Sequence, residues 1–80
     1  MQKTGKLTDL QQGDRALVVD IDPGDSMRRR LQDLGLISGT EVTCLKKSPL
    51  GDPVAYYIRW AVIALRSEDS SRVRVHYGVI

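Results

Sequence analysis

The side chains in this sequence that are best suited to chemistry are few. Cys44 is the only cysteine and His76 the only histidine, and neither has a partner at the spacing of a metal site or of a nucleophile and its base. Asp20, Asp22 and Asp25 lie close together, but they lack the ligand spacing and the closing glutamate of a calcium loop. We therefore predict no metal site and no catalytic residues.

The glycines also form no cofactor-binding pattern. Gly35, Gly39 and Gly51 are spaced for turns rather than for the start of a helix, where a glycine-rich loop would hold a phosphate. Cys44 is expected to be a small buried hydrophobic residue, and His76 a solvated side chain. The sequence therefore favours a protein that is not an enzyme and takes no cofactor.

A run of arginines is the one concentrated charge. Arg28, Arg29 and Arg30 are consecutive, and they could meet a phosphate or an acidic protein surface, or simply form the solvated side of a helix. Lys46 and Lys47 would add to this charge if the helix packs beside their strand. Arg28 and Arg29 are therefore candidate partner-binding residues.

The loop over residues 48–53 is the second candidate for a contact. Leu50 and Gly51 lie between Pro49 and Pro53, and prolines cannot donate to a sheet ladder. A large apolar side chain at the tip of such a loop either contacts a partner or folds back onto the core. Both alternatives stay open for Leu50.

Short strands must position these residues. Met27, Leu31 and Leu34 are spaced at i, i+4 and i+7, which predicts one short helix that Gly35 ends and that Asp25 or Ser26 caps. We expect a mainly β fold, a strongly bent antiparallel barrel of five or six strands with this helix inserted after the second strand. The other predicted elements are strands over Lys6–Leu10, Arg15–Asp22, Glu41–Lys47 with Leu45 breaking its alternation, Val54 onward and Arg72–Tyr77, a turn near Trp60–Val62, and a polar or helical turn over Arg66–Ser71.

Length and composition predict a small cytoplasmic protein. The 80 residues suit a single domain over 1–80, and the formal charge of +2 is too mild to indicate a nucleic-acid partner. No uncharged apolar run is long enough to cross a membrane, and the N-terminus lacks the apolar region of a secretory signal. A lone cysteine fits a reducing compartment.

The order of several short motifs resembles the FeoA family, small cytoplasmic accessory proteins of bacterial ferrous iron uptake. The resemblance runs from about Leu7 to Val75. It rests on the segments LTDLQQGDRALVVDID, RRRLQDLGL, SGTEV, PLGDP and ALR, the last at Ala64-Leu65-Arg66. It implies an SH3-like β-barrel, no catalysis and no resident cofactor.

The same resemblance implies a partner. FeoA proteins are thought to act with FeoB, a membrane transporter with a cytoplasmic GTP-binding domain, so membrane association is expected only through that partner. The contacts we predict are Leu50, Gly51, Arg28, Arg29 and Trp60. A nucleic-acid-binding small barrel and a stand-alone relative of the C-terminal domain of iron-dependent repressors are the alternatives. An iron carrier ranks last, because the chain offers one histidine and one cysteine.

One departure from the family concerns the turn before ALR. Family members commonly carry Gly-Tyr where this chain has Trp60-Ala61. Glycine tolerates a positive φ and tryptophan resists it, so we expect a turn of different type or position. Trp60 also places a large aromatic group on the surface, where it could alter a partner contact or drive the chain to form a homo-oligomer.

Overall fold

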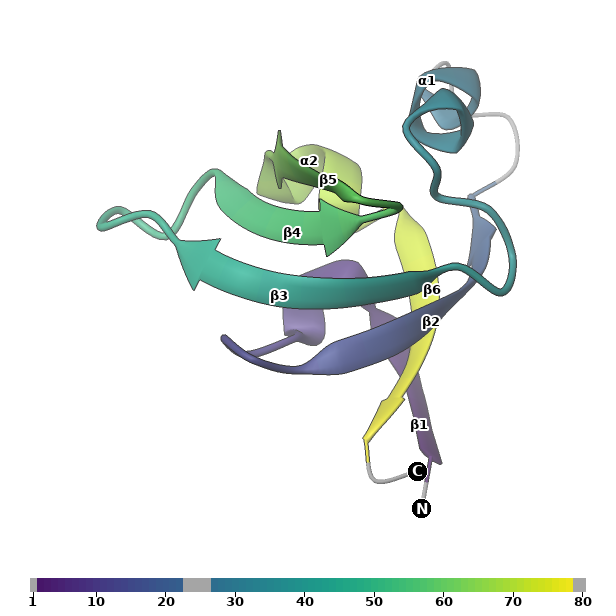
Figure 1. Ribbon diagram of the computed structural model, residues 1–80, viewed down its shortest axis with the longest axis horizontal. Coiled ribbons are helices and arrows are strands. Elements are labelled where there is room, and N and C mark those ends of the chain that lie inside the picture. Colours follow the sequence, from purple (N-terminus) through teal and green to yellow (C-terminus); the bar gives the residue numbers. More distant parts are fainter. Residues whose placement is uncertain (1, 23–26, 79–80) are drawn as a thin grey trace.

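Six antiparallel strands form one sheet in the order β1–β6–β2–β3–β4–β5. The computed structural model describes residues 2–22 and 27–78. The predicted mainly β fold is confirmed, and its helix lies after the second strand, as expected (Figure 1). The strands are β1 Gln2–Lys6, β2 Arg15–Ile21, β3 Glu41–Lys47, β4 Val54–Ile58, β5 Ala61–Leu65 and β6 Val73–Gly78; the helices are α1 Arg28–Asp33 and α2 Ser67–Ser70, with a 3-10 turn, η1, at Leu7–Asp9.

Two irregular positions interrupt the strand ladders. The register between β2 and β6 shifts between Val18 and Asp20, and the register between β3 and β4 shifts between Cys44 and Lys46. An extra residue in one strand bends it and increases its twist. The predicted break in alternation at Leu45 is therefore confirmed. In Figure 1, β1 and β6 run steeply across the direction of β3 and β4.

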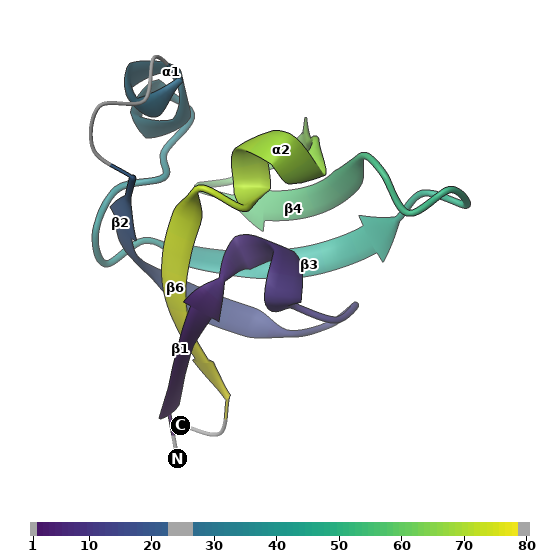
Figure 2. The ribbon, with the colours of Figure 1, turned by 180° about the vertical axis from the view of Figure 1, so that it is seen from behind.

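The core lies inside this bent sheet and is closed by the helical turns. Figure 2 shows η1 and α2 on the side from which β1 and β6 are seen in front. Tyr56 is the largest fully buried side chain, and its hydroxyl lies 3.5 Å from the carbonyl oxygen of Leu7 in η1. The buried apolar residues are Leu7, Leu10, Ala16, Val18, Ile21, Leu31, Leu36, Val42, Cys44, Val54, Tyr56, Ile58, Leu65, Val73 and Val75.

Helix α1 packs on this core through the predicted stripe. Leu31 is buried, and Met27 and Leu34 pack against the core while remaining partly exposed. Gly35 ends the helix at a φ of 110°, which glycine adopts at little cost. The predicted helix stop is therefore confirmed. Asp25 and Ser26, the expected caps, lie outside the described residues.

The predicted strand over Lys6–Leu10 is wrong. Residues after Lys6 do not continue a strand, because Leu7–Asp9 form the 3-10 turn. The Asp9 carboxylate accepts the Lys6 backbone N–H at 2.9 Å and closes that turn. Leu7 and Leu10 are three residues apart, which is one turn of a 3-10 helix, so both side chains point into the core, where they are buried.

The lysine pair is also not beside the arginines. α1 lies near the start of β3, whereas Lys46 and Lys47 lie at its far end (Figure 1). The expectation that they extend the basic helix is therefore wrong. The connection from α1 to β3 is short, so the helix can reach only the near end of that strand.

Candidate partner-binding surfaces

The predicted contact residues divide between the two ends of the β3–β4 hairpin. The loop that holds Leu50 and Gly51 lies at one end, and α1 lies at the other, beside the turn that joins β4 to β5 (Figure 1). The segment just after α1 lies close to this turn, because a Cβ added to Gly35 would lie 2.6 Å from Cδ of Arg59. Arg28, Arg29 and Trp60 therefore share one end, and Leu50 and Gly51 do not belong to it.

The β4–β5 turn has an unusual backbone. Ile58 pairs with Ala61, so only Arg59 and Trp60 form the turn, and both have positive φ values, 46° and 72°. Positive φ at both central residues is the pattern of a type I′ hairpin turn, which normally takes Asn-Gly or Gly-Gly. The expectation that tryptophan would avoid a positive φ is wrong, and the turn begins one residue before the predicted range.

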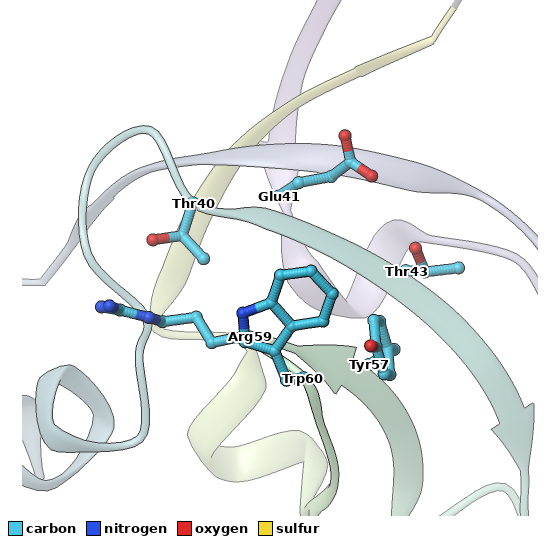
Figure 3. Close-up of a pocket in the computed structure, with 6 residues that line it drawn as sticks. All are labelled: Thr40, Glu41, Thr43, Tyr57, Arg59 and Trp60. Atoms are coloured by element: carbon cyan, nitrogen blue, oxygen red, sulfur yellow. The ribbon is translucent and has the colours of Figure 1, made fainter.

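Trp60 lies on the outer face of this hairpin. Its side chain is 91% exposed, although it borders a pocket of about 240 Å³. Figure 3 shows the indole between the side chains of Arg59 and Tyr57, pointing toward the strand that carries Glu41 and Thr43. The pocket is lined by Thr40, Glu41, Thr43, Tyr57, Arg59 and Trp60.

Two neighbours extend the exposed apolar area around Trp60. Tyr57 and Val62 are paired across β4 and β5, and both are exposed. We call Tyr57, Trp60 and Val62 the Trp60 surface. Aromatic residues beside an arginine are the composition that interface hot spots favour. Sequence reasoning missed Tyr57 and Val62, although the alternation in β4 and a two-residue turn would have placed them on one face.

The Leu50 loop is held by its own hydrogen bonds. Leu50 is 94% exposed. The Gly51 N–H donates to the Ser48 carbonyl at 2.8 Å, and the Ser48 N–H donates to the Pro53 carbonyl at 3.2 Å. Gly51 has a φ of 84°. Leu50 therefore points away from the core, and the alternative in which it folds back is wrong.

The base of this loop is tied to α2. An Asp52 carboxylate oxygen accepts the backbone N–H of Ser67 at 2.7 Å, which satisfies a free donor at the start of the helix. The loop thus presents one leucine from a fixed backbone. A loop whose backbone is already fixed loses little conformational entropy when it binds a partner.

Arg28 and Arg29 are exposed on α1. Within residues 2–22 and 27–78, neither arginine forms an ion pair; the ion pair found there joins Arg74 to Asp20 at 2.8 Å. The two arginines can therefore meet an acidic surface without first breaking a pair of their own.

Cys44 is buried and His76 is exposed, as predicted. Cys44 is fully buried, and burial raises the pKa of its thiol, which keeps it protonated and unreactive. The His76 side chain is exposed, and its Nδ1 lies 3.1 Å from the Thr4 hydroxyl. Among the described residues, no three His, Cys, Asp or Glu side chains gather to hold a metal ion.

A family comparison identifies the chain. The family model for the FeoA domain matches residues 5–77. The chain belongs to the FeoA family. A curated FeoA relative from Porphyromonas gingivalis, an Fe(2+) transport protein A/Fe(2+) transporter FeoB fusion protein, is 33% identical over 70 residues. The match covers 88% of this chain but only 8% of that protein.

Solved FeoA structures share the fold. An FeoA-like protein from Clostridium acetobutylicum is 29% identical, with a TM-score of 0.91 over 100% of this chain and 93% of that one. Stenotrophomonas maltophilia FeoA, complexed with zinc and described as an SH3 domain protein, is 31% identical, with a TM-score of 0.77 over 88% of this chain and 87% of that one. The SH3-like fold that the resemblance implies is therefore confirmed.

The helices of this FeoA chain are short. The longest in the described residues, α1, has six residues, and no helix among those residues is both long and apolar enough to span a bilayer.

Proposed function

We propose that this chain is a non-catalytic cytoplasmic accessory protein of ferrous iron transport, which binds the cytoplasmic part of a FeoB transporter and modulates it. The observation that carries this proposal is the P. gingivalis relative, in which an Fe(2+) transport protein A and a FeoB transporter are named as one fusion protein. A covalent link holds two modules at high effective concentration. The presence of both modules in one protein supports an association between this chain and a FeoB transporter.

The Leu50 loop is the contact that we propose for the transporter. Leu50 is the most exposed large apolar side chain of the described residues, and its loop is fixed by the Ser48, Gly51 and Asp52 hydrogen bonds. A buried anchor in a partner's pocket dominates many interfaces. The prolines on either side and the tie to α2 hold that anchor in place before binding.

Arg28, Arg29 and Trp60 form a separate candidate contact at the other end. Exposed charges at the rim of an interface change the association rate and its salt dependence more than the affinity. We therefore propose that the two arginines speed association by attracting this chain to an acidic surface of the transporter. Charge reversal of both should slow association at low salt, whereas loss of Leu50 should speed dissociation.

Titration against the purified cytoplasmic part of FeoB tests the proposal. Binding is measured without nucleotide, with GDP and with a GTP analogue, for the wild type and for Leu50→Ser. We expect Leu50→Ser to weaken binding at least tenfold, which corresponds to about 1.4 kcal/mol, while Leu50→Met binds as the wild type does. Trp60→Ser and a double charge reversal of Arg28 and Arg29 are measured alongside.

Two results would contradict this proposal. The function fails if the wild type binds neither the cytoplasmic part in any nucleotide state nor the full transporter in membranes. The site fails if binding occurs and Leu50→Ser leaves it unchanged. Because Leu50 is almost entirely solvent-exposed, the substitution should leave the fold intact, and a thermal melt verifies this.

A further inference from the structure

The sheet has two edges that differ in chemistry. β1 forms one edge and β5 the other. β1 carries Lys3 and Lys6, both exposed, and lysines are a common means of preventing another strand from pairing with an edge. β5 has the sequence AVIAL, with no charge and no proline. The β5 edge is therefore open to a further strand.

The backbone of β5 offers hydrogen bonds along this edge. Antiparallel residues alternate between hydrogen-bonded and non-hydrogen-bonded pairs. Ile58 and Ala61 close the two-residue turn as a bonded pair, so the N–H and C=O groups of Val62 and Ala64 point away from β4. Within the described chain, no backbone hydrogen bond outside the ladders involves either residue. Four polar groups thus line the free edge.

The side chains beside this edge leave room for a strand. Val62 is 64% exposed, and Ala61 and Ala64 are also exposed. Ile63, Ala64 and Leu65 border a groove of about 300 Å³ whose far wall is α1. No charged side chain lies within β5 itself, whereas Arg30, Arg66 and Asp69 line the groove beside it.

We propose that a second copy of this chain pairs with β5 through its own β5, antiparallel about a two-fold axis at Ile63. In this register, Val62 faces Ala64 of the second copy, and Ala64 faces its Val62. The outward groups of one copy therefore meet complementary outward groups of the other, which gives four backbone hydrogen bonds. A symmetric interface must be self-complementary in this way.

The backbone carries this pairing. Arg66 is exposed and lies three residues from the two-fold axis at Ile63. The indole of Trp60 points toward β3, which lies across β4 from the β5 edge, so the indole takes no part in the pairing (Figure 3).

The expected dimer is weak, because pairing of two five-residue strands buries less area than a standard interface. Sedimentation equilibrium of the full chain over a wide concentration range measures it. Ala64→Pro removes one amide donor in each copy, and proline is tolerated on an edge strand whose N–H faces solvent. We expect the dimer dissociation constant to rise at least tenfold.

Two further variants keep the test decisive if Ala64→Pro unfolds. Val62→Lys adds the protecting charge that β1 already has, and it should also give a monomer. Ala64→Thr keeps the amide and should still dimerise. In the wild type, hydrogen exchange at the Val62 and Ala64 amides should slow as concentration rises, whereas exchange at Ala61, Ile63 and Leu65 should be slow throughout.

A wild type that is monomeric at every concentration would overturn this inference, as would a dimer that Val62→Lys leaves intact. The transporter contact at Leu50 lies at the other end of the hairpin (Figure 1). Leu50→Ser should therefore leave the dimer unchanged, and Ala64→Pro should leave the Leu50-dependent binding unchanged, so the two proposals fail separately.

Discussion

Replacement of Trp60 by glycine should relieve backbone strain at the β4–β5 turn. Trp60 has a φ of 72° and a side chain that is 91% exposed. A left-handed backbone costs a non-glycine residue roughly 1–2 kcal/mol. Glycine removes that cost but loses about 0.5–1 kcal/mol more conformational entropy on folding.

The comparison that isolates the backbone effect is Trp60→Gly against Trp60→Ala. Both variants lose the same small contact of the indole, about 20 Å² or 0.5 kcal/mol, and only the alanine variant keeps the strain. Trp60→Gly should therefore be more stable than Trp60→Ala by about 0.5–1 kcal/mol. For a chain of this size, the difference corresponds to a melting temperature that is about 2–8 °C higher.

Circular dichroism is the appropriate assay for this pair. Trp60 is the only tryptophan, so neither variant has indole fluorescence to follow. Thermal unfolding is recorded at low protein concentration, where self-association through β5 does not contribute. Equal melting temperatures, or a more stable alanine variant, would refute the argument, because they would mean that residue 60 does not hold a left-handed conformation.

Three further predictions concern stability. Leu31→Ala should lower the free energy of unfolding by about 2–5 kcal/mol in a urea titration, because Leu31 is buried in the core. Asp52→Ala should cost about 1 kcal/mol by the loss of the 2.7 Å bond from the Ser67 N–H, and Asp52→Asn, which keeps an acceptor, should cost less in the same titration. The free energy of unfolding should fall as pH rises above about 9. Burial raises the pKa of Cys44 and of Tyr56 in the folded state above their ordinary values of 9.0 and 10.0, so these groups ionise first in the unfolded chain. The double variant Cys44→Ala, Tyr56→Phe should show a smaller change in the free energy of unfolding between pH 7 and 11.

Local chemistry predicted the parts of the fold that depend on neighbours in sequence. Spacing identified α1, and Gly35 identified its end, because both depend on a few adjacent residues. The β3 strand and the loop after it followed from alternation and from Pro49 and Pro53. The 3-10 turn at Leu7–Asp9 was missed, because the same residues also suit an extended strand. The hydrogen bond from the Lys6 N–H to the Asp9 carboxylate selects the turn.

The candidate surfaces were harder to predict, because they depend on which elements lie side by side. Exposure of Leu50 and Trp60 could be anticipated, but their separation at opposite ends of one hairpin required the strand order. The φ values at Arg59 and Trp60 carry no sequence signal, since tertiary pairing of β4 with β5 imposes the turn against the preference of both residues.

Uptake of labelled Fe(2+) tests the central claim most directly. It is measured in cells that keep their FeoB transporter but lack this chain, and that are supplied with the wild type, Leu50→Ser or Leu50→Met. We predict that the wild type and Leu50→Met change uptake to the same extent, and that Leu50→Ser, expressed at the same level, leaves it as in cells without the chain. Uptake that is the same with and without the wild type, or that Leu50→Ser changes as fully as the wild type, would contradict the account.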